Sequence, residues 1–338
     1  MLDDFLDVLR CPDCRSETAS LALIPFTADK PIQQGIAQCM ACRSWYPIED
    51  GVLELLPAGL RDGARRDAFL SRHGSRFADT PKSATAPEIH VQQKVQRDHF
   101  DWYADNEKQT YEAYQAMPVW RAFDNKTLGR WHKLVGDESL ILDLACGDGR
   151  CALSFPSGHR VLGIDISRGQ IANALRRSRS VTRSGRTAFI VADASEPPVR
   201  KRSFDAVTSY GALHHLPSPR AGLLTSLSLL KPKGIFLAAE PNLSLFRPLF
   251  DILMRVLPIW HEVANDEPLI SGEMVKGWLN GHAVDLRTAT SVFLPPHLIN
   301  MMGFYLGSAM FRWSDALCSR IPMLRNNGGL IMIEVRAG

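Results

Sequence analysis

Residues 140–150 read LILDLACGDGR, and this stretch decides the fold. Its apolar start is typical of a buried β-strand, and the strand runs into a turn with two glycines. Gly147 and Gly149 allow the backbone to approach a ligand closely. We expect a helix to begin at about Arg150. The sequence therefore predicts a strand, a turn and a helix that bind a nucleotide-like ligand.

The same turn also fits a second pattern. Gly147, Gly149 and Ala152 match the dinucleotide fingerprint of dehydrogenases, in which alanine can take the third position. Asp143 lies four residues before Gly147, where a dinucleotide site needs no carboxylate. A carboxylate at this position can take up a ligand's ammonium group through water or neighbouring amides. The strands that follow in the sequence distinguish a dinucleotide site from a site that needs this carboxylate.

Two further predicted strands also end in acidic residues. Residues 161–165 read VLGID, and Asp165 lies 18 residues after Gly147, a spacing suited to pairing with ribose hydroxyls. Residues 188–192 form the next apolar run, and Asp193 after it can accept a hydrogen bond from an adenine amino group. Three strands thus end in carboxylates at one edge of the predicted sheet, which is where α/β folds bind ligands.

This arrangement resembles the class I S-adenosylmethionine (SAM)-dependent methyltransferases, in the branch that contains ubiquinone- and menaquinone-biosynthesis enzymes. Their D-x-G-x-G-x-G motif appears here from Asp143 to Gly149, with Ala145 in place of the first glycine. Residues 203–209 and 210–216 look like the family's fourth strand and its continuation. Residues 229–237 look like the turn into strand five, with Lys233 in place of a glycine, and residues 328–335 like the last antiparallel strand.

The resemblance spans about residues 95–338 and implies an α/β fold. This fold is a Rossmann-like, seven-stranded class I methyltransferase sheet with helices on both faces. SAM is the implied cofactor. The implied SAM-binding residues lie at the three strand ends, in the turn and in the fourth strand: Asp143, Ala145, Cys146, Gly147, Asp148, Gly149, Asp165, Ile166, Asp193, Ala194 and Ser209.

Four residues after strands four and five are candidates for catalysis. His214 and His215 follow strand four, where either can act as a general base or donate a hydrogen bond to the substrate. Alternatively, both pack the turn between strand and helix. Tyr210 can contact cofactor or substrate. Glu240 ends strand five, where it is either catalytic or a cap for the turn that follows.

Four of the seven cysteines form two pairs near the N-terminus. Cys11 and Cys14 form one C-x-x-C knuckle, and Cys39 and Cys42 form the other. Two such knuckles supply a closed tetrahedral S₄ site, which suits a structural Zn²⁺ and leaves no open position for catalysis. The alternative is two redox pairs or free thiols.

The residues around the knuckles resemble a zinc ribbon. Residues 45–57 read WYPIEDGVLELLP, an ending typical of the small activator subunits that serve tRNA and release-factor methyltransferases. A related ribbon heads some bacterial ribosomal-RNA guanine methyltransferases. We therefore divide the chain into a ribbon at 1–58, a linker at 59–95 with a short helix at 65–72, and a methyltransferase domain at 96–338.

Two apolar segments at about 241–270 and 295–324 are not explained by the SAM-binding core, and we interpret them as a helical cap. They can form a lid over a hydrophobic substrate, dock on a membrane surface, bury a dimer interface or simply pack on the sheet. Residues 91–135 show a helical pattern rich in aromatic side chains. These aromatics either cover a ligand or pack the leading helices on the sheet.

The composition is that of a soluble globular protein. The chain has 338 residues, 45% hydrophobic and 22% charged, with a net charge of +3. These values exclude wholesale disorder and do not demand nucleic acid. We find no signal peptide and no apolar run of the ~18–20 residues that span a membrane. We therefore expect a cytoplasmic protein without a transmembrane segment.

The leading hypothesis is a SAM-dependent methyltransferase that acts on a small, apolar metabolite or a lipid-linked acceptor, at an oxygen, nitrogen or carbon atom. An RNA methyltransferase is the first alternative, because six arginines gather within residues 168–186. A SAM-binding scaffold without catalysis is the second. The ribbon or the cap can also bind a protein partner or a second copy of the chain.

Overall fold

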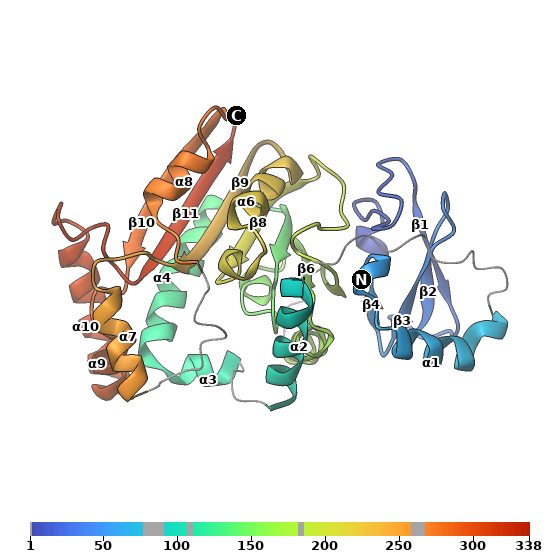
Figure 1. Ribbon diagram of the computed structural model, residues 1–338, viewed down its shortest axis with the longest axis horizontal. Coiled ribbons are helices and arrows are strands. Elements are labelled where there is room, and N and C mark those ends of the chain that lie inside the picture. The colour runs from blue at the N-terminus through green and yellow to red at the C-terminus, as the bar shows by residue number, and fades with distance from the viewer. Residues whose placement is uncertain (1, 77–90, 107–110, 182–185, 258–267) are drawn as a thin grey trace.

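The computed structural model describes residues 2–76, 91–106, 111–181, 186–257 and 268–338 (Figure 1). Within these residues one sheet of eleven strands runs in the order β1-β2-β3-β4-β7-β6-β5-β8-β9-β11-β10. The strands of the predicted methyltransferase region are β5 (Leu140–Leu144), β6 (Arg160–Asp165), β7 (Arg186–Val191), β8 (Phe204–Tyr210), β9 (Leu230–Pro241), β10 (Val284–Ser291) and β11 (Leu330–Ala337).

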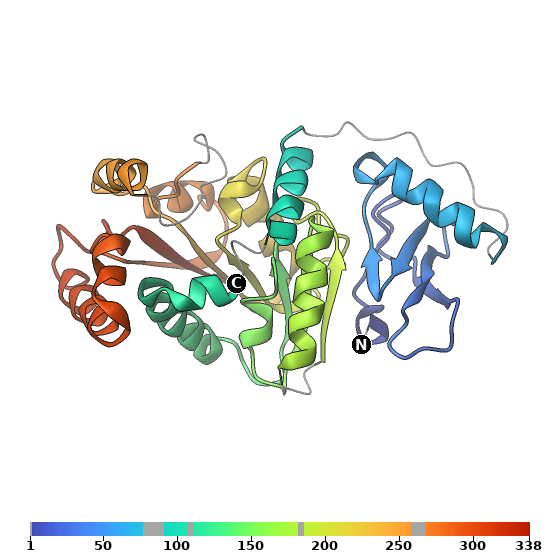
Figure 2. The same cartoon turned by 90° about the horizontal axis from the view of Figure 1, so that it is seen from below.

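Seven neighbouring strands of this sheet, in the order β7-β6-β5-β8-β9-β11-β10, confirm the predicted methyltransferase sheet. β5 lies at the centre with parallel neighbours β6 and β8, and β11 runs antiparallel between β9 and β10. The central strands are buried on both faces, which explains their continuous apolar runs. α4 (Pro118–Leu134) and α5 (Arg168–Ser180) share one apolar core, while α6 (Pro219–Leu229) and α8 (Gly272–Trp278) share another on the opposite face (Figure 2).

The helix expected from about Arg150 is absent, and that prediction is wrong. A single 3₁₀ turn, η4 (Ala152–Ser154), follows the glycine-rich turn instead. Pro156 explains the difference, because a proline has no backbone N–H to donate and disfavours helical dihedrals at the residue before it. Phe155 is accordingly extended, with φ −67° and ψ 143°.

The ribbon is not a separate sheet. Its strands are β1 (Leu21–Pro25), β2 (Gln34–Cys39), β3 (Trp45–Glu49) and β4 (Val52–Glu54). β4 pairs in parallel with β7, Leu53 opposite Ile190 and Glu54 opposite Val191. The backbone of Leu9 bridges to Val199 as well. The ribbon therefore extends the catalytic sheet at its β7 edge (Figure 1).

Part of the predicted linker is folded onto the ribbon. The short helix expected there is present as α1 (Gly63–His73), and the Asp62 side chain caps it by accepting from Arg65 N at 3.1 Å. Phe69 is fully buried and stacks on Trp45 with ring centroids 5.7 Å apart. Residues 77–90 of the predicted linker lie outside the described residues.

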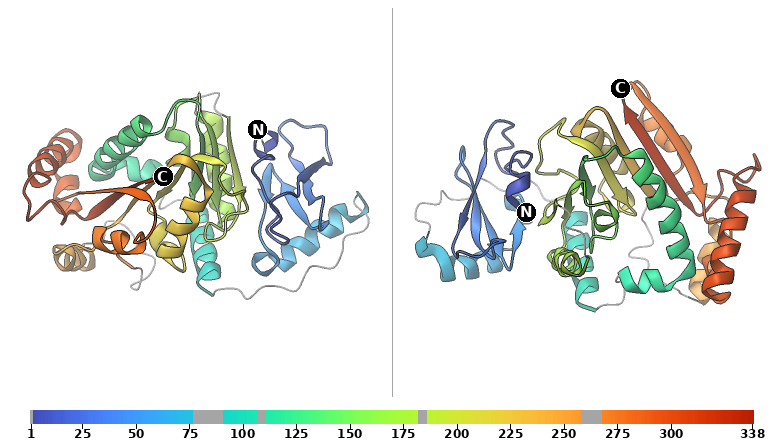
Figure 3. Two further views of the ribbon diagram at one scale, coloured as in Figure 1. Left: turned by 90° about the horizontal axis from the view of Figure 1, so that it is seen from above. Right: turned by 180° about the vertical axis from the view of Figure 1, so that it is seen from behind.

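The leading and cap segments are helical, as expected. α2 (Val91–Asn106) and α3 (Tyr111–Ala116) precede α4, while α7 (Arg247–Val256), α9 (Pro296–Met301) and α10 (Gly303–Cys318) form the cap. Residues 258–267 of the first cap segment lie outside the described residues. The cap helices lie at the end of the molecule opposite the ribbon (Figures 1 and 3). No described helix is both long and apolar enough to cross a bilayer.

Candidate functional site

A cavity of about 900 Å³ opens at the carboxyl ends of β5, β6, β7 and β8. Twelve predicted site residues line it. They are Asp143, Ala145, Cys146, Gly147, Asp148, Asp165, Ile166, Asp193, Ala194, Tyr210, His214 and His215. The sheet edge thus brings together the three strand-end carboxylates and the two histidines, as the sequence predicted.

Three predicted site residues are not among those that line the cavity. Gly149 has φ +82°, and a Cβ there would meet Phe189 at 3.0 Å, so this glycine serves the turn. Ser209 is buried inside β8. Glu240, which was expected to be either catalytic or a cap for the turn, is fully buried as well.

The glycine-rich turn alternates left-handed residues. Ala145, Gly147 and Gly149 have φ of 49°, 52° and 82°. Such dihedrals cost an L-residue ~1–2 kcal/mol, whereas glycine adopts them freely. The turn thereby directs Gly147 N to Asp165 Oδ2 at 2.8 Å. Ala145, which stands where the family has glycine, is the strained member.

The Ala145→Gly variant is expected to be more stable than the wild type by ~0.5–1 kcal/mol. The relief of left-handed strain outweighs glycine's larger entropy in the unfolded chain. The midpoint of urea unfolding measures this change. Ala309 is an exposed residue inside α10, and Ala309→Gly should instead lose ~1 kcal/mol. If Ala145→Gly is destabilised as Ala309→Gly is, Ala145 is not strained in the wild type.

Asp165 presents a buried carboxylate to the cavity. Its Oδ2 accepts from Gly147 N and its Oδ1 from Ser167 N, both at 2.8 Å. Burial, together with the nearby Asp101 carboxylate, raises the pKa of Asp165 to about 6, although the backbone N–H groups act against this shift. An acceptor fixed by backbone amides is well placed to bind hydroxyl groups of a ligand.

Asp143 is bound mainly by the protein itself. Its Oδ2 accepts from Ala152 N at 2.9 Å and its Oδ1 from the Thr208 hydroxyl at 2.7 Å. Burial raises the pKa of Asp143 to about 7. The Asp143 carboxylate therefore connects β8, through Thr208, to the segment after the glycine-rich turn, through the backbone N–H of Ala152.

Helix α2 supplies four cavity residues. Phe100 and Tyr103 belong to the aromatic segment expected either to cover a ligand or to pack on the sheet, whereas the two glutamines were not predicted. Gln93, Gln96, Phe100 and Tyr103 all line the cavity, and their spacing places them on one helical face. Gln93 Nε2 donates to Asp193 Oδ2 and, at 2.7 Å, to Ser195 Oγ. The mixed polar and aromatic stripe at this spacing is the signal that could have identified them.

A buried ion pair forms another part of the cavity wall that sequence analysis missed. Arg150 binds both carboxylate oxygens of Asp124, at 2.6 and 2.9 Å, and the Tyr210 hydroxyl donates to Asp124 Oδ1 at 2.5 Å. The Arg150 guanidinium lies 4.9 Å from the ring centroids of Tyr114 and Tyr210. Burial holds the pKa of Tyr210 well above its usual range. Tyr210 therefore stays protonated, which makes it a donor and not a base.

His214 and Glu240 form a hydrogen-bonded pair behind the cavity wall. Glu240 Oε2 lies 2.6 Å from His214 Nδ1, and Oε1 accepts from Ala212 N at 3.1 Å and Leu213 N at 2.9 Å. The Glu240 oxygens thus hold the loop and the imidazole from inside the protein, an arrangement that suits a positioning residue. The His215 ring lies 3.9 Å from that of His214.

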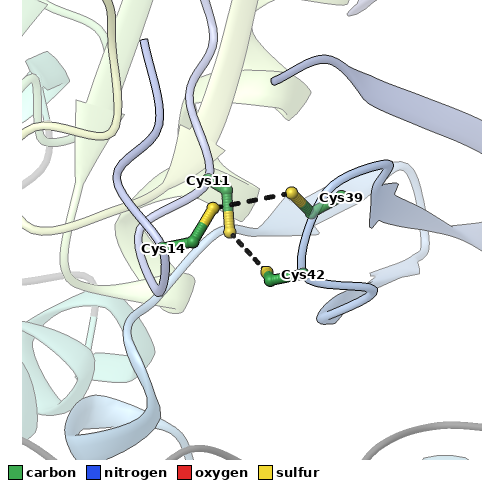
Figure 4. Close-up of side chains that lie close together, drawn as sticks. All are labelled: Cys11, Cys14, Cys39 and Cys42. Atoms are coloured by element: carbon green, nitrogen blue, oxygen red, sulfur yellow. Dashed lines mark hydrogen bonds between the residues drawn. The ribbon is translucent and has the colours of Figure 1, made fainter. Parts of the chain in front are cut away.

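The four paired cysteines gather at one point in the ribbon (Figure 4). Their Sγ atoms all lie within 4.8 Å of one another, and the shortest approaches are 3.6 Å for Cys11 to Cys42 and 3.7 Å for Cys14 to Cys39. A tetrahedral zinc ion with Zn–S bonds of ~2.3 Å requires sulfur atoms ~3.8 Å apart. The Tyr46 hydroxyl lies 3.0 Å from Cys11 Sγ and can donate to a thiolate. The geometry and chemistry of this donor set fit Zn²⁺.

The arginine cluster on and after α5 is partly engaged within the protein. Arg177 Nη1 donates to the carbonyl oxygen of Asp148 at 2.7 Å, and Arg168 Nη2 donates to that of Glu49 at 3.1 Å. Arg183 lies outside the described residues. These contacts give two of the arginines a structural role and do not single out an RNA surface.

The chain matches known methyltransferases in sequence. Residues 142–238 match a family model described as a methyltransferase domain. An O-methyltransferase of Pyrenophora dematioidea is 30% identical over 204 residues, which cover 58% of this chain and 74% of that protein. O-methyltransferase rstn1 of Aspergillus nomiae is 30% identical over 41% of this chain, and the demethylmenaquinone methyltransferase of Renibacterium salmoninarum is 29% identical over 44%. The chain spans 61% and 66% of the lengths of these last two relatives.

The fold is also similar to that of a solved structure. The [4+2]-cyclase SpnF superposes with a TM-score of 0.50 at 17% identity, over 74% of this chain and 97% of that one. At this identity the likeness supports the class of fold and says nothing of the reaction.

Proposed function

The chain belongs to the class I SAM-dependent methyltransferases, and from this premise we propose that it transfers a methyl group to a hydroxyl oxygen of a small, apolar or lipid-linked acceptor. The observation that carries the proposal is the His214–Glu240 pair at the wall of a cavity that also contains the three strand-end carboxylates. Two of the three relatives described above are named O-methyltransferases, which supports oxygen as the acceptor atom.

The cofactor end of the cavity would be formed by the glycine-rich turn, Asp165 and Asp193. The Asp165 carboxylate would accept from ribose hydroxyls, and Gly147 keeps that side of the turn free of a side chain. Asp193 would accept from the adenine amino group, next to Gln93. When bound, SAM supplies an electrophilic methyl group on a sulfonium.

His214 would act as the general base. Its Nδ1 is held by Glu240, so Nε2 is the ring nitrogen that can take a proton from the acceptor hydroxyl. The buried Glu240 carboxylate stabilises the imidazolium that results and keeps the ring oriented. The Arg150–Asp124 pair holds Tyr210 in place, and the neutral Tyr210 hydroxyl donates a hydrogen bond to Asp124.

The remaining wall of the cavity favours an apolar acceptor. Phe100, Tyr103, Tyr114, Trp120 and Phe123 line it from the leading helices, and Leu269 and Leu330 add apolar contacts. Helix α7 contributes Met254 together with the charged residues Arg247, Asp251 and Arg255. A cavity of about 900 Å³ lies at the upper end of the volumes found for small-molecule sites. It therefore has room for both a cofactor and an acceptor.

A structural zinc ion held by Cys11, Cys14, Cys39 and Cys42 completes the proposal. The ion would cross-link the two knuckles, and its thiolate ligands suit the reducing cytoplasm that we expect for the chain. No cysteine of the four is free to act in catalysis once all are bound, so the role of the metal would be structural.

Transfer of labelled methyl groups tests the function. The purified protein is incubated with methyl-labelled SAM and a fractionated cell extract, and the label is followed into each fraction. Label in the organic-soluble fraction is the expected result. Label in RNA would overturn the proposed acceptor. Tight SAM binding without any label would favour a scaffold. The Asp165→Ala variant is the negative control, because it should not bind SAM.

Binding of S-adenosylhomocysteine should depend on pH through Asp165. Only the ionised carboxylate can accept from both ribose hydroxyls, so binding tightens as the pH rises through about 6, the pKa of Asp165. At pH 5 the dissociation constant should be about tenfold larger than at pH 8. Calorimetry measures this, and the Asp165→Asn variant should bind weakly without the step. A wild-type affinity that is flat between pH 5 and 8 would contradict the assignment.

A further inference from the structure

Helix α7 lies at the edge of the cavity, and its apolar side chains do not face the protein core. Arg247, Asp251, Met254 and Arg255 line the cavity, whereas Leu249 and Ile252 are 54% and 56% exposed. None of its residues is buried. A surface helix normally turns its apolar stripe to the core. This helix turns its polar side to the cavity and its apolar side outward.

Neighbouring cap helices expose more apolar side chains at the same end of the molecule. α7 contacts α9 through His297, whose Nε2 donates to the carbonyl oxygen of Leu257 at 2.7 Å, and α9 leads into α10 (Figure 1). We call the exposed apolar side chains of these segments the apolar face. Its members are Leu245, Leu249, Ile252, Val256, Leu257, Leu298, Met301, Tyr305, Leu306, Trp313, Leu317 and Met323.

Within the described residues of the cap segments, the exposed charges have one sign. In residues 243–257 and 296–325, the exposed charged side chains are Arg255, which also lines the cavity, Arg312, Arg320 and Arg325. The two acidic residues of these segments are engaged: Asp251 pairs with Arg247 at 2.5 Å, and Asp315 is buried and accepts from Ser291 Oγ at 2.8 Å. In these described segments the exposed apolar side chains are thus accompanied by exposed arginines, a combination that is complementary to an anionic lipid surface.

We propose that the apolar face docks on an anionic membrane surface, so that a lipid-linked acceptor enters the cavity past α7. The entry of an acceptor rests on the proposed function; the docking does not. Trp, Leu and Met side chains would insert at the level of the headgroups, and the arginines would be attracted to the anionic lipids. A two-fold dimer through the same face would instead bring like charges together.

Flotation of the full-length protein with lipid vesicles tests the docking. Vesicles of equal parts phosphatidylglycerol and phosphatidylcholine should carry the wild type with them, and phosphatidylcholine alone should carry at least tenfold less. The Leu249→Ser/Ile252→Ser double variant should bind anionic vesicles at least tenfold more weakly. Val95, 56% exposed on α2 at a distance from the cap, gives the matched control Val95→Ser, which should bind like the wild type.

A charge variant and two controls make the result decisive. Arg312→Glu/Arg320→Glu should also lose binding, and the binding of the wild type should weaken as salt is raised. Unchanged S-adenosylhomocysteine affinity and thermal midpoint show that the variants fold. No binding to anionic vesicles, or a dimer in light scattering that Leu249→Ser/Ile252→Ser dissociates, would overturn the proposal. Vesicle binding without methyl transfer would leave docking standing and refute the proposed function instead.

Discussion

The His214→Gln variant is expected to lose about 10²–10⁴-fold in kcat while it keeps its affinity for S-adenosylhomocysteine. Glutamine can still donate from its amide to the buried Glu240 carboxylate, so the loop that Glu240 holds through Ala212 N and Leu213 N should stay in place. What the variant lacks is a group that takes the acceptor's proton. Steady-state kinetics with the product identified by label transfer measure the loss.

The pH dependence of kcat distinguishes a base from a merely structural histidine. The wild type should show a limb that rises with pH as His214 becomes neutral, and His214→Gln should lose it. Glu240→Gln should lower kcat by about 10²-fold and alter the same limb, because an amide nitrogen facing Nδ1 disfavours the tautomer in which Nε2 accepts a proton. His215→Gln is the matched control and should cost less than tenfold. A His214→Gln enzyme within threefold of the wild type would refute the general base.

The parts of the site that could be predicted follow from local sequence and sheet geometry. Asp143, Asp165 and Asp193 each end an apolar run, and parallel strands bring their carboxyl ends to one edge. The histidines follow β8 by the same logic. The two C-x-x-C pairs likewise predicted one cluster, because each knuckle orients two sulfur atoms and a closed site needs both pairs.

The parts that could not be predicted depend on pairs that are distant in the sequence. Glu240 was a candidate for catalysis or for capping because it ends a strand, but the sequence did not reveal that its buried oxygens bind His214 and two backbone N–H groups. Nothing in the local pattern places Asp124 of α4 against Arg150. The orientation of α7 was also open, since its apolar periodicity is the same whether the stripe faces the core or the outside.

The attachment of the ribbon to the methyltransferase sheet also could not be predicted from the sequence. β4 has three residues, and its sequence does not say whether its free edge pairs with another strand. In the structure it pairs with β7, and the ribbon side chains Phe5, Leu9 and Leu53 share an apolar core with Ile190 and Val199 of the catalytic unit. Because the core is shared, we expect metal binding in the ribbon to affect the stability of the whole chain.

The Cys39→Ser variant is therefore expected to lose its zinc and to destabilise the catalytic sheet as well as the ribbon. Structural zinc contributes on the order of 10 kcal/mol in small isolated modules. Here we expect a loss of several kcal/mol, or about 10 °C in the thermal midpoint. Metal analysis should give one zinc per wild-type chain and almost none in the variant. Cys318, far from the ribbon on α10, gives the control Cys318→Ser, which should keep the metal and stay within about 2 °C.

The shape of the thermal transition carries the sharper test. If the ribbon shares its core and its sheet edge with β7, the ribbon and the catalytic unit unfold together, and calorimetry of the wild type should show a single transition. In Cys39→Ser that single transition should move down as a whole, and S-adenosylhomocysteine binding should disappear at the same temperature. Loss of the ribbon would leave the β7 edge unpaired and open to association with other chains. A variant that loses only a small early transition, and keeps the main one where it was, would show instead that the catalytic sheet is stable without the ribbon.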